Sequence, residues 1–206
     1  MDKILVSACL LGQRCRYDGK DNEESYFEVL NRYFDLVPFC PEVAGGLPTP
    51  RPRSEIKGSQ VITENGKTVT REFEAGAAKA LEICRFLNID KAILKESSPS
   101  CGVHQIHDGK FHNKLIHGQG RTASLLQSHD IRVMNEEEGK AFLDAYIAHL
   151  ESKPAYQKKE ETPVSSQNQK LRDWRRHKDQ IRASKDHHVK DKGFRKGPRK
   201  PFKKDR

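Results

Sequence analysis

Short apolar runs alternate with longer segments of helical pattern through residues 1–150. This alternation limits the possible folds of the chain more than any other feature of the sequence. The short runs are rich in Ile, Leu and Val, whereas the longer segments repeat apolar residues at helical spacing. Strands that alternate with helices form largely parallel sheets covered by helices, so we expect a single α/β domain of that kind. The predicted strands are residues 3–8, 35–39, 92–94 and 131–134, and the predicted helices are residues 23–33, 70–88, 123–128 and 136–150.

The connections between these elements carry their own signals. Residues 61–70 contain Asn65-Gly66, a favoured two-residue turn, and predict a hairpin. A second small hairpin is expected over residues 103–115. Residues 41–56 hold four prolines and two glycines, which excludes regular structure and indicates a shaped loop. Thr70 is the predicted N-cap of the helix that follows.

The N-terminal apolar run is short, begins after Asp2 and is interrupted by Ser7, so it predicts a strand and not a secretion signal. No segment reaches the ~18 apolar residues that a membrane helix needs. We therefore expect a cytoplasmic protein with no membrane partner. In a reducing compartment, cysteines are more often metal-binding or catalytic than paired in disulfides.

Three of the five cysteines share a position in this scheme. Cys9, Cys40 and Cys101 each follow a predicted strand closely. In an open α/β sheet, ligands bind beyond the carboxyl ends of the strands. If the three strands are parallel neighbours, the three thiols converge at that edge.

The other two cysteines differ from this pattern. Cys84 lies in the apolar face of the predicted helix 70–88, where a cysteine packs as a small apolar side chain. Cys15 lies in a polar loop between Arg14 and Arg16, which would lower its pKa. No base partner is evident beside Cys15, so its role stays open.

The spacing of the cysteines favours one kind of metal site. Zinc favours close pairs such as C-x-x-C, which the chain lacks. Three widely separated thiolates suit an iron–sulfur cluster, whose bulk needs ligands from several loops. Three thiolates on a four-iron cluster leave one iron open to substrate, by analogy with the open position of catalytic zinc sites. A packed or redox role for these thiols remains the alternative.

Four separated motifs resemble the thiouracil desulfidase family. In chain order they are SACLLGQRCRYDG, CPEVAGGLPTPR with the following SEI, VTREFEAGA and KESSPSCG, all within residues 1–150. The resemblance implies a 4Fe–4S enzyme that removes sulfur from thiolated uracil without net redox chemistry. It also implies that Cys9, Cys40 and Cys101 hold the cluster. Thr68 departs from the pattern, because the family commonly has an acidic residue before the VT of the third motif.

The chemistry needs a general base as well as a metal. A thiocarbonyl sulfur is soft and suits an open iron, and water must then attack the ring carbon. Glu42, two residues after Cys40, is the predicted base. The alternative is a loop carboxylate that pairs with Arg51 or Arg53.

Further polar residues complete the predicted site. Ser98 and Ser100 are predicted to hold the pyrimidine or to relay a proton, with plain turn chemistry as the alternative. Arg51, Arg53 and Glu55 are predicted to line the mouth of the site and to contact base or phosphate.

The charge of the chain is unevenly divided. Residues 151–206 hold 19 Lys and Arg against 8 Asp and Glu, whereas residues 1–150 hold 19 against 21. We expect a basic and largely disordered tail appended to a domain that ends near residue 150. Such a tail suits phosphate backbones and predicts tRNA as a partner, with a solubilising role as the alternative. The predicted nucleic-acid contacts are Trp174, Arg175, Arg176 and Lys178.

Three function classes follow from these observations. The first is an iron–sulfur desulfidase that acts on a thiolated pyrimidine, either free or in tRNA. The second is a non-catalytic RNA-binding protein whose cysteines hold a structural metal or nothing. The third is a redox protein that uses Cys9 and Cys15 as an exchange pair.

Overall fold

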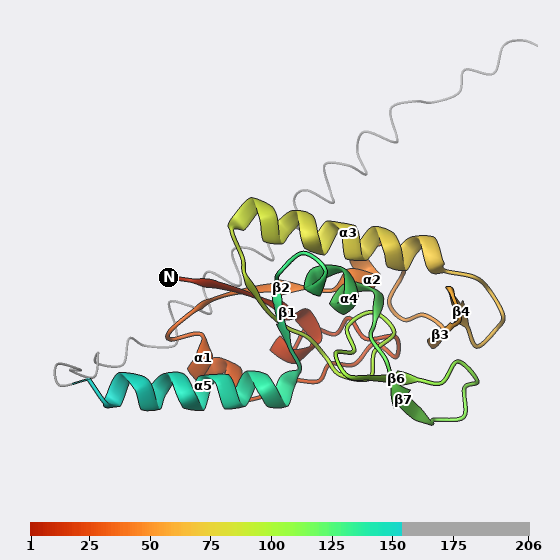
Figure 1. Cartoon of the computed structure of the whole chain (residues 1–206). Helices are drawn as coiled ribbons and strands as arrows, with labels where there is room; N and C mark the ends of the chain where they lie inside the picture. Colours follow the sequence, from red (N-terminus) through yellow and green to blue (C-terminus); the bar gives the residue numbers. More distant parts are fainter. Residues whose placement is uncertain (154–206) are drawn as a thin grey trace, which may run out of the picture. The chain divides into compact units, whose positions relative to one another are not determined.

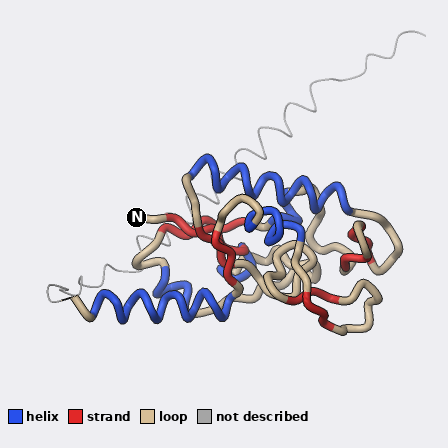
Figure 2. The backbone as a smooth tube through the Cα atoms, viewed as in Figure 1, coloured by secondary structure: helices blue, strands red, loops and turns tan. Residues whose placement is uncertain are grey.

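The structure, a computed structural model, describes residues 1–153 and is shown in Figures 1 and 2. Its centre is a four-stranded sheet of order β2-β1-β5-β8 in which every neighbouring pair is parallel. The predicted α/β fold with a mostly parallel sheet is confirmed. The strands are β1 (Lys3–Ser7), β2 (Asp35–Phe39), β5 (Lys91–Ile93) and β8 (Arg132–Met134).

Helices cover both faces of the sheet (Figure 1). Leu5 of β1 packs in one buried cluster with Ala80, whereas its neighbour Ile4 packs in another with Leu30 and Leu143. The alternation arises because successive side chains of a strand point to opposite faces. No helix within residues 1–153 is long and apolar enough to span a membrane. One face carries α3 (Thr70–Leu87) and α4 (Arg121–Gln127), and the other carries α1 (Tyr26–Leu30) and α5 (Glu136–Glu151).

Short elements fill the loops that follow the strands. A single 3-10 turn, η1, and a single α-helical turn, α2, directly follow β1 and β2, and two antiparallel hairpins lie further along the chain. These elements are η1 (Ala8–Leu11), α2 (Pro41–Ala44), β3 (Ser54–Lys57) with β4 (Gln60–Thr63), and β6 (Gln105–His107) with β7 (Leu115–His117).

Two local expectations were wrong in extent. The helix expected over residues 23–33 is reduced to α1, because the backbone N–H groups of Arg32 and Tyr33 donate three residues back and tighten the chain into turns. Residues 41–56 were expected to lack regular structure, yet they contain α2 and most of β3. Pro41 is tolerated at the first helical position, where its missing N–H has no helical partner to lose.

The residues around β4 confirm one expectation and correct another. The hairpin at Asn65-Gly66 forms: the N–H of Thr63 donates to the Lys67 oxygen at 2.8 Å, the N–H of Val69 donates to the Val61 oxygen at 2.9 Å, and Ile62 and Thr68 form an isolated bridge between these bonds. The other edge of β4 pairs with β3, which the sequence did not predict. Thr70 is not an N-cap: it lies inside α3, and its Oγ1 accepts a hydrogen bond from the N–H of Val61 at 2.9 Å.

Candidate functional site

Cysteines gather at the carboxyl ends of three adjacent strands. Cys9 lies in η1 directly after β1, Cys40 lies between β2 and α2, and Cys101 lies in the loop after β5. Because β2, β1 and β5 are parallel neighbours, their carboxyl ends share one edge of the sheet. The structure thus brings together the three cysteines that the sequence singled out, and all are free thiols.

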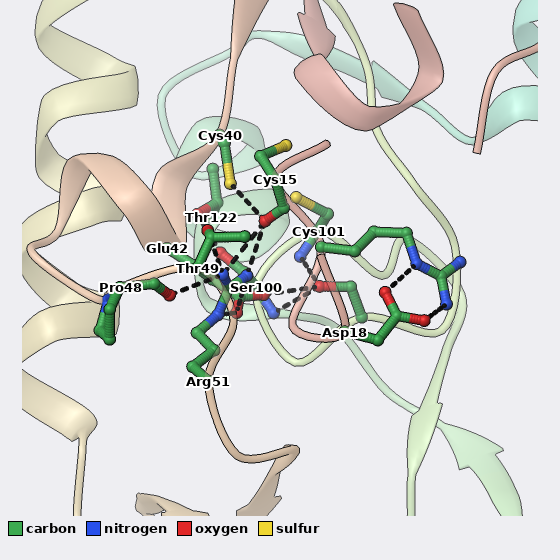
Figure 3. Close-up of polar contacts among 12 residues, drawn as sticks. Cys15, Asp18, Cys40, Glu42, Pro48, Thr49, Arg51, Ser100, Cys101 and Thr122 are labelled. Carbon is green, nitrogen blue, oxygen red and sulfur yellow. Dashed lines mark hydrogen bonds and ion pairs between the residues drawn. The ribbon is translucent and has the colours of Figure 1, made fainter. Parts of the chain in front are cut away.

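A fourth thiol, Cys15, belongs to the same group. Its side chain forms hydrogen bonds with those of Cys9 and Cys40, and its carbonyl oxygen lies 3.8 Å from the Cys40 Sγ. Figure 3 shows Cys15, Cys40 and Cys101 side by side. The sequence did not decide the role of Cys15, although its place in the same motif as Cys9 indicated a shared site.

The four thiols do not have the same acidity. Hydrogen bonding from Cys15 lowers the pKa of Cys9, and it lowers that of Cys40 to about 7 against the opposing effect of burial. As the donor in these bonds to Cys40 and Cys9, Cys15 has its pKa raised, the opposite of the lowering expected from its arginine neighbours. Burial raises the pKa of Cys101. Thiolate character, the form that binds metals, therefore favours Cys9 and Cys40.

A half-buried carboxylate, Glu96, and a hydroxyl shape the loop that carries Cys101. Glu96 Oε1 accepts hydrogen bonds from the backbone N–H groups of Val103 at 3.1 Å and Gln105 at 2.9 Å. The Ser98 Oγ accepts one from the N–H of Cys101 at 3.1 Å. The turn that presents Cys101 is therefore fixed on both sides.

The two candidate serines point to different partners. Ser98 Oγ lies 3.5 Å from Glu42 Oε1. Ser100 is fully buried, and its Oγ lies 2.9 Å from the Thr122 Oγ1 in α4. Of the two, the structure places only Ser98 beside Glu42.

Glu42 and Arg51 form a buried ion pair (Figure 3). Glu42 lies in the first turn of α2, and its Oε2 accepts from the Arg51 Nε at 2.8 Å and Nη2 at 2.7 Å. The Arg51 guanidinium also donates to the carbonyl oxygens of Cys15 and Pro48 and to the hydroxyl of Thr49. The sequence raised an Arg51 pairing as the alternative to a base role for Glu42, but this pairing leaves Oε1 facing Ser98.

Arg53 and Glu55 pair with each other and not with the thiols. Glu55 is fully buried, and it accepts from Arg53 and from the backbone N–H of Phe111 at 2.9 Å. Arg53 also donates to the Asn113 side chain. These bonds tie the β3–β4 hairpin to the loop between β6 and β7. Arg51, Arg53 and Glu55 were all predicted to contact substrate. In the structure, the charged group of each one bonds to other groups of the protein.

The remaining predicted residues lie elsewhere. Cys84 packs inside α3, and burial raises its pKa to about 11, as suits a packing residue. A cavity of about 620 Å³ near the amino ends of β5 and β8 is lined in part by Cys84 and by none of the predicted site residues. Trp174, Arg175, Arg176 and Lys178 lie outside the described residues.

Comparisons with known proteins point to one family. The model of the family described as 2-thiouracil desulfurase matches residues 4–138, a span that includes all four clustered cysteines. The uncharacterized protein YbbK of Bacillus subtilis (strain 168) is 40% identical over 145 residues, which cover 66% of this chain and 96% of YbbK. Among solved structures, the [4Fe-4S]-dependent thiouracil desulfidase TudS is 44% identical with a TM-score of 0.67. That match covers 72% of this chain and 99% of the TudS chain.

Proposed function

The chain belongs to the 2-thiouracil desulfurase family, and from that premise we propose that it removes sulfur from thiolated uracil with a [4Fe–4S] cluster. One observation carries the proposal: Cys9, Cys40 and Cys101 lie at the carboxyl ends of three adjacent parallel strands. TudS, whose chain is matched almost completely, is a desulfidase that depends on such a cluster.

The residues present fit this cofactor. Thiolates are the usual ligands of iron–sulfur clusters, and hydrogen bonding from Cys15 lowers the pKa of Cys9 and Cys40 and so promotes their thiolate forms. Within residues 1–153, no group of three or more His, Cys, Asp or Glu is arranged to hold a single metal ion. We assign Cys9, Cys40 and Cys101 as ligands and Cys15 as a neighbouring thiol.

The residues around the thiols have separate roles in the reaction. Cys9, Cys40 and Cys101 would hold the cluster, which would supply Lewis-acid chemistry for the thiocarbonyl sulfur. Glu42 acts as general base, and its Oε1 takes a proton from the water that attacks the ring carbon. Ser98, 3.5 Å from Oε1, holds that water or the pyrimidine. The net change is thiocarbonyl plus water to carbonyl plus hydrogen sulfide, without a change of oxidation state.

A finer proposal concerns the form of the substrate. Residues 151–206 carry a large excess of Lys and Arg, and such segments bind phosphate backbones. Thiolated uridine in tRNA therefore suits the whole chain better than the free base. The predicted contacts of Trp174, Arg175, Arg176 and Lys178 with RNA belong to this proposal.

Anaerobic purification followed by iron and sulfide analysis tests the function. We expect about four irons and four sulfides per chain in the wild type and in the control Cys84→Ala, and their loss in Cys101→Ala. Sulfide release from 2-thiouracil and from thiolated tRNA is then measured on the loaded wild type. A loaded protein that releases no sulfide from either substrate contradicts the proposal. A protein without iron even after reconstitution favours a non-catalytic RNA-binding role.

A further inference from the structure

Arg51 is buried in a loop near the carboxyl edge of the sheet, with only 4% of its side chain exposed. A buried guanidinium is costly unless its five N–H donors have acceptors. Here they do: Nε and Nη2 reach Glu42, both terminal nitrogens lie 3.1 Å from the Cys15 oxygen, and Nη1 lies 3.2 Å from acceptors on Pro48 and Thr49. The guanidinium is thus fully engaged with the protein.

These bonds join segments that are distant in sequence. The loop of Cys15 lies on one side of the guanidinium, and the first turn of α2, which begins directly after Cys40, lies on the other. The backbone N–H of Arg51 also donates to the carbonyl oxygen of Tyr17 at 2.8 Å. Arg51 therefore connects the two loops that carry three of the four clustered thiols.

The two carboxylate oxygens of Glu42 have unequal surroundings. Oε2 accepts two charge-assisted bonds from Arg51, at 2.8 and 2.7 Å. Among the described residues, the contact of Oε1 is the Ser98 hydroxyl at 3.5 Å, which is long for a hydrogen bond. Because a guanidinium is planar and binds a carboxylate through more than one N–H, it fixes the orientation of the group as well as its charge.

We propose that Arg51 is a positioning residue of the desulfidase reaction: by holding Glu42 Oε2, it keeps Oε1 directed toward Ser98 and the attacking water. This inference rests on the proposed function, in which Glu42 is the base. It replaces the substrate contact expected from the sequence, because the side chain has no donor left for a ligand. A lysine would keep the charge but lose the planar fork.

The test compares Arg51→Gln and Arg51→Lys with Arg71→Gln, a matched change at an exposed position of α3. Iron and sulfide are quantified in each full-length variant before the kinetics with 2-thiouracil. We expect Arg51→Gln to lower kcat by roughly 100-fold and Arg51→Lys by roughly 10-fold, with KM changed less than about 3-fold. Arg71→Gln keeps the wild-type values. A raised KM with unchanged kcat would show a substrate contact and overturn the inference.

A double-mutant cycle and a crystal structure separate this role from a general structural one. If Arg51 acts through Glu42, adding Arg51→Gln to Glu42→Gln lowers kcat by less than about 3-fold more, whereas independent roles give multiplied losses and refute the inference. The structure of Arg51→Lys is expected to show a rotated Glu42 carboxylate, and an unmoved carboxylate contradicts it. This structural readout needs no activity, so a wild type inactive on thiolated uracil would refute the function without deciding the role of Arg51.

Discussion

Ser98 and Ser100 are two residues apart on one loop, but their hydroxyl groups contact different residues. The Ser98 hydroxyl accepts the N–H of Cys101 and lies next to Glu42 Oε1. The Ser100 hydroxyl lies against Thr122, in a fully buried contact between the loop and α4. We therefore propose that Ser98 has the reactive role and that Ser100 holds the loop to the body of the domain.

Alanine variants should separate these two roles. We expect Ser98→Ala to lower kcat on 2-thiouracil by about 10- to 100-fold with iron retained, because the Glu42 oxygen loses its hydroxyl neighbour. Ser100→Ala strands the Thr122 hydroxyl in the interior and should lower the free energy of unfolding by about 1–3 kcal/mol. Steady-state kinetics and urea denaturation measure both effects. The assignment fails if Ser100→Ala impairs kcat more than Ser98→Ala does.

Glu96 accepts hydrogen bonds from several backbone and side-chain groups. Backbone N–H groups of Ser97, Val103 and Gln105 and the side-chain amide of Asn135 all donate to it. Burial alone would raise its pKa, but these donors outweigh burial and lower it. A carboxylate with a lowered pKa in the folded state stabilises the fold at neutral pH. That stabilisation is lost as the pH falls through the ordinary carboxyl range and below.

Glu96→Gln is therefore expected to be less stable than the wild type by an amount that depends on pH. The free energy of unfolding should fall by about 1–3 kcal/mol at neutral pH, because the amide cannot accept all of these bonds. The gap from wild type should narrow as the pH falls through the ordinary carboxyl range and below it, because the wild-type carboxylate then becomes protonated as well. Urea denaturation across pH measures the gap, with Glu74→Gln at an exposed position of α3 as control. A gap that stays constant with pH would rule out the ionised carboxylate as its source.

At the scale of elements, α2 rests on α3 through backbone contacts. A Cβ on Gly76 would lie 2.1 Å from the Pro41 oxygen, and a Cβ on Gly45 would lie 1.9 Å from the Glu72 oxygen. Two glycines, one from each element, thus permit an approach that no side chain allows. Because Cys40 directly precedes α2, the distance between α2 and α3 also sets where this thiol and Glu42 lie.

Gly76→Ala tests this contact. Alanine normally favours a helix interior by about 1 kcal/mol over glycine, but here the methyl group must displace the backbone of α2. We expect a net loss of about 1–3 kcal/mol in unfolding free energy and a lower iron content per chain. Glu74→Ala, at an exposed position of the same helix, is the control, because it introduces no contact with α2. Equal losses in the two variants would argue against the rigid backbone contact.

The sequence predicted the elements whose pattern is local and failed where tertiary contacts decide. The strands of the sheet and the long helix α3 follow from apolar spacing, and the convergence of Cys9, Cys40 and Cys101 follows from their order on the sheet. The pairing of β4 with β3, in addition to its bonds across Asn65-Gly66, depends on packing that no short window contains.

Side-chain partnerships in the site were harder to foresee than its location. Glu42 and Arg51 are nine residues apart in a proline-rich loop, where the direction of each side chain depends on the loop conformation. The sequence could raise the pairing only as an alternative and could not show which carboxylate oxygen remains free. For the same reason, it could not decide between Ser98 and Ser100 as the neighbour of Glu42.

For the whole chain, the family match and the basic charge occupy different stretches. The match ends at residue 138, whereas residues 151–206 carry 19 Lys and Arg against 8 Asp and Glu. Residues 1–150, with 19 against 21, have no excess of positive charge. On the proposal that the chain binds tRNA, we expect long-range attraction of this polyanion to depend on the C-terminal stretch, and desulfidase chemistry to depend on the body.

Deleting residues 155–206 should separate these two properties. We expect the truncated protein to bind thiolated tRNA more weakly and with a shallower dependence of log Kd on log salt, because fewer phosphate counterions are released. Its kcat/KM for free 2-thiouracil should equal that of the full chain, since every residue assigned to the reaction lies before residue 102. Filter binding across salt concentrations and sulfide release measure the two quantities. A full-length variant with Trp174, Arg175, Arg176 and Lys178 changed to Ala or Gln controls for chain length. Equal loss on both substrates would mean that the stretch supports the folded domain, and unchanged tRNA binding would move the RNA contact to the body.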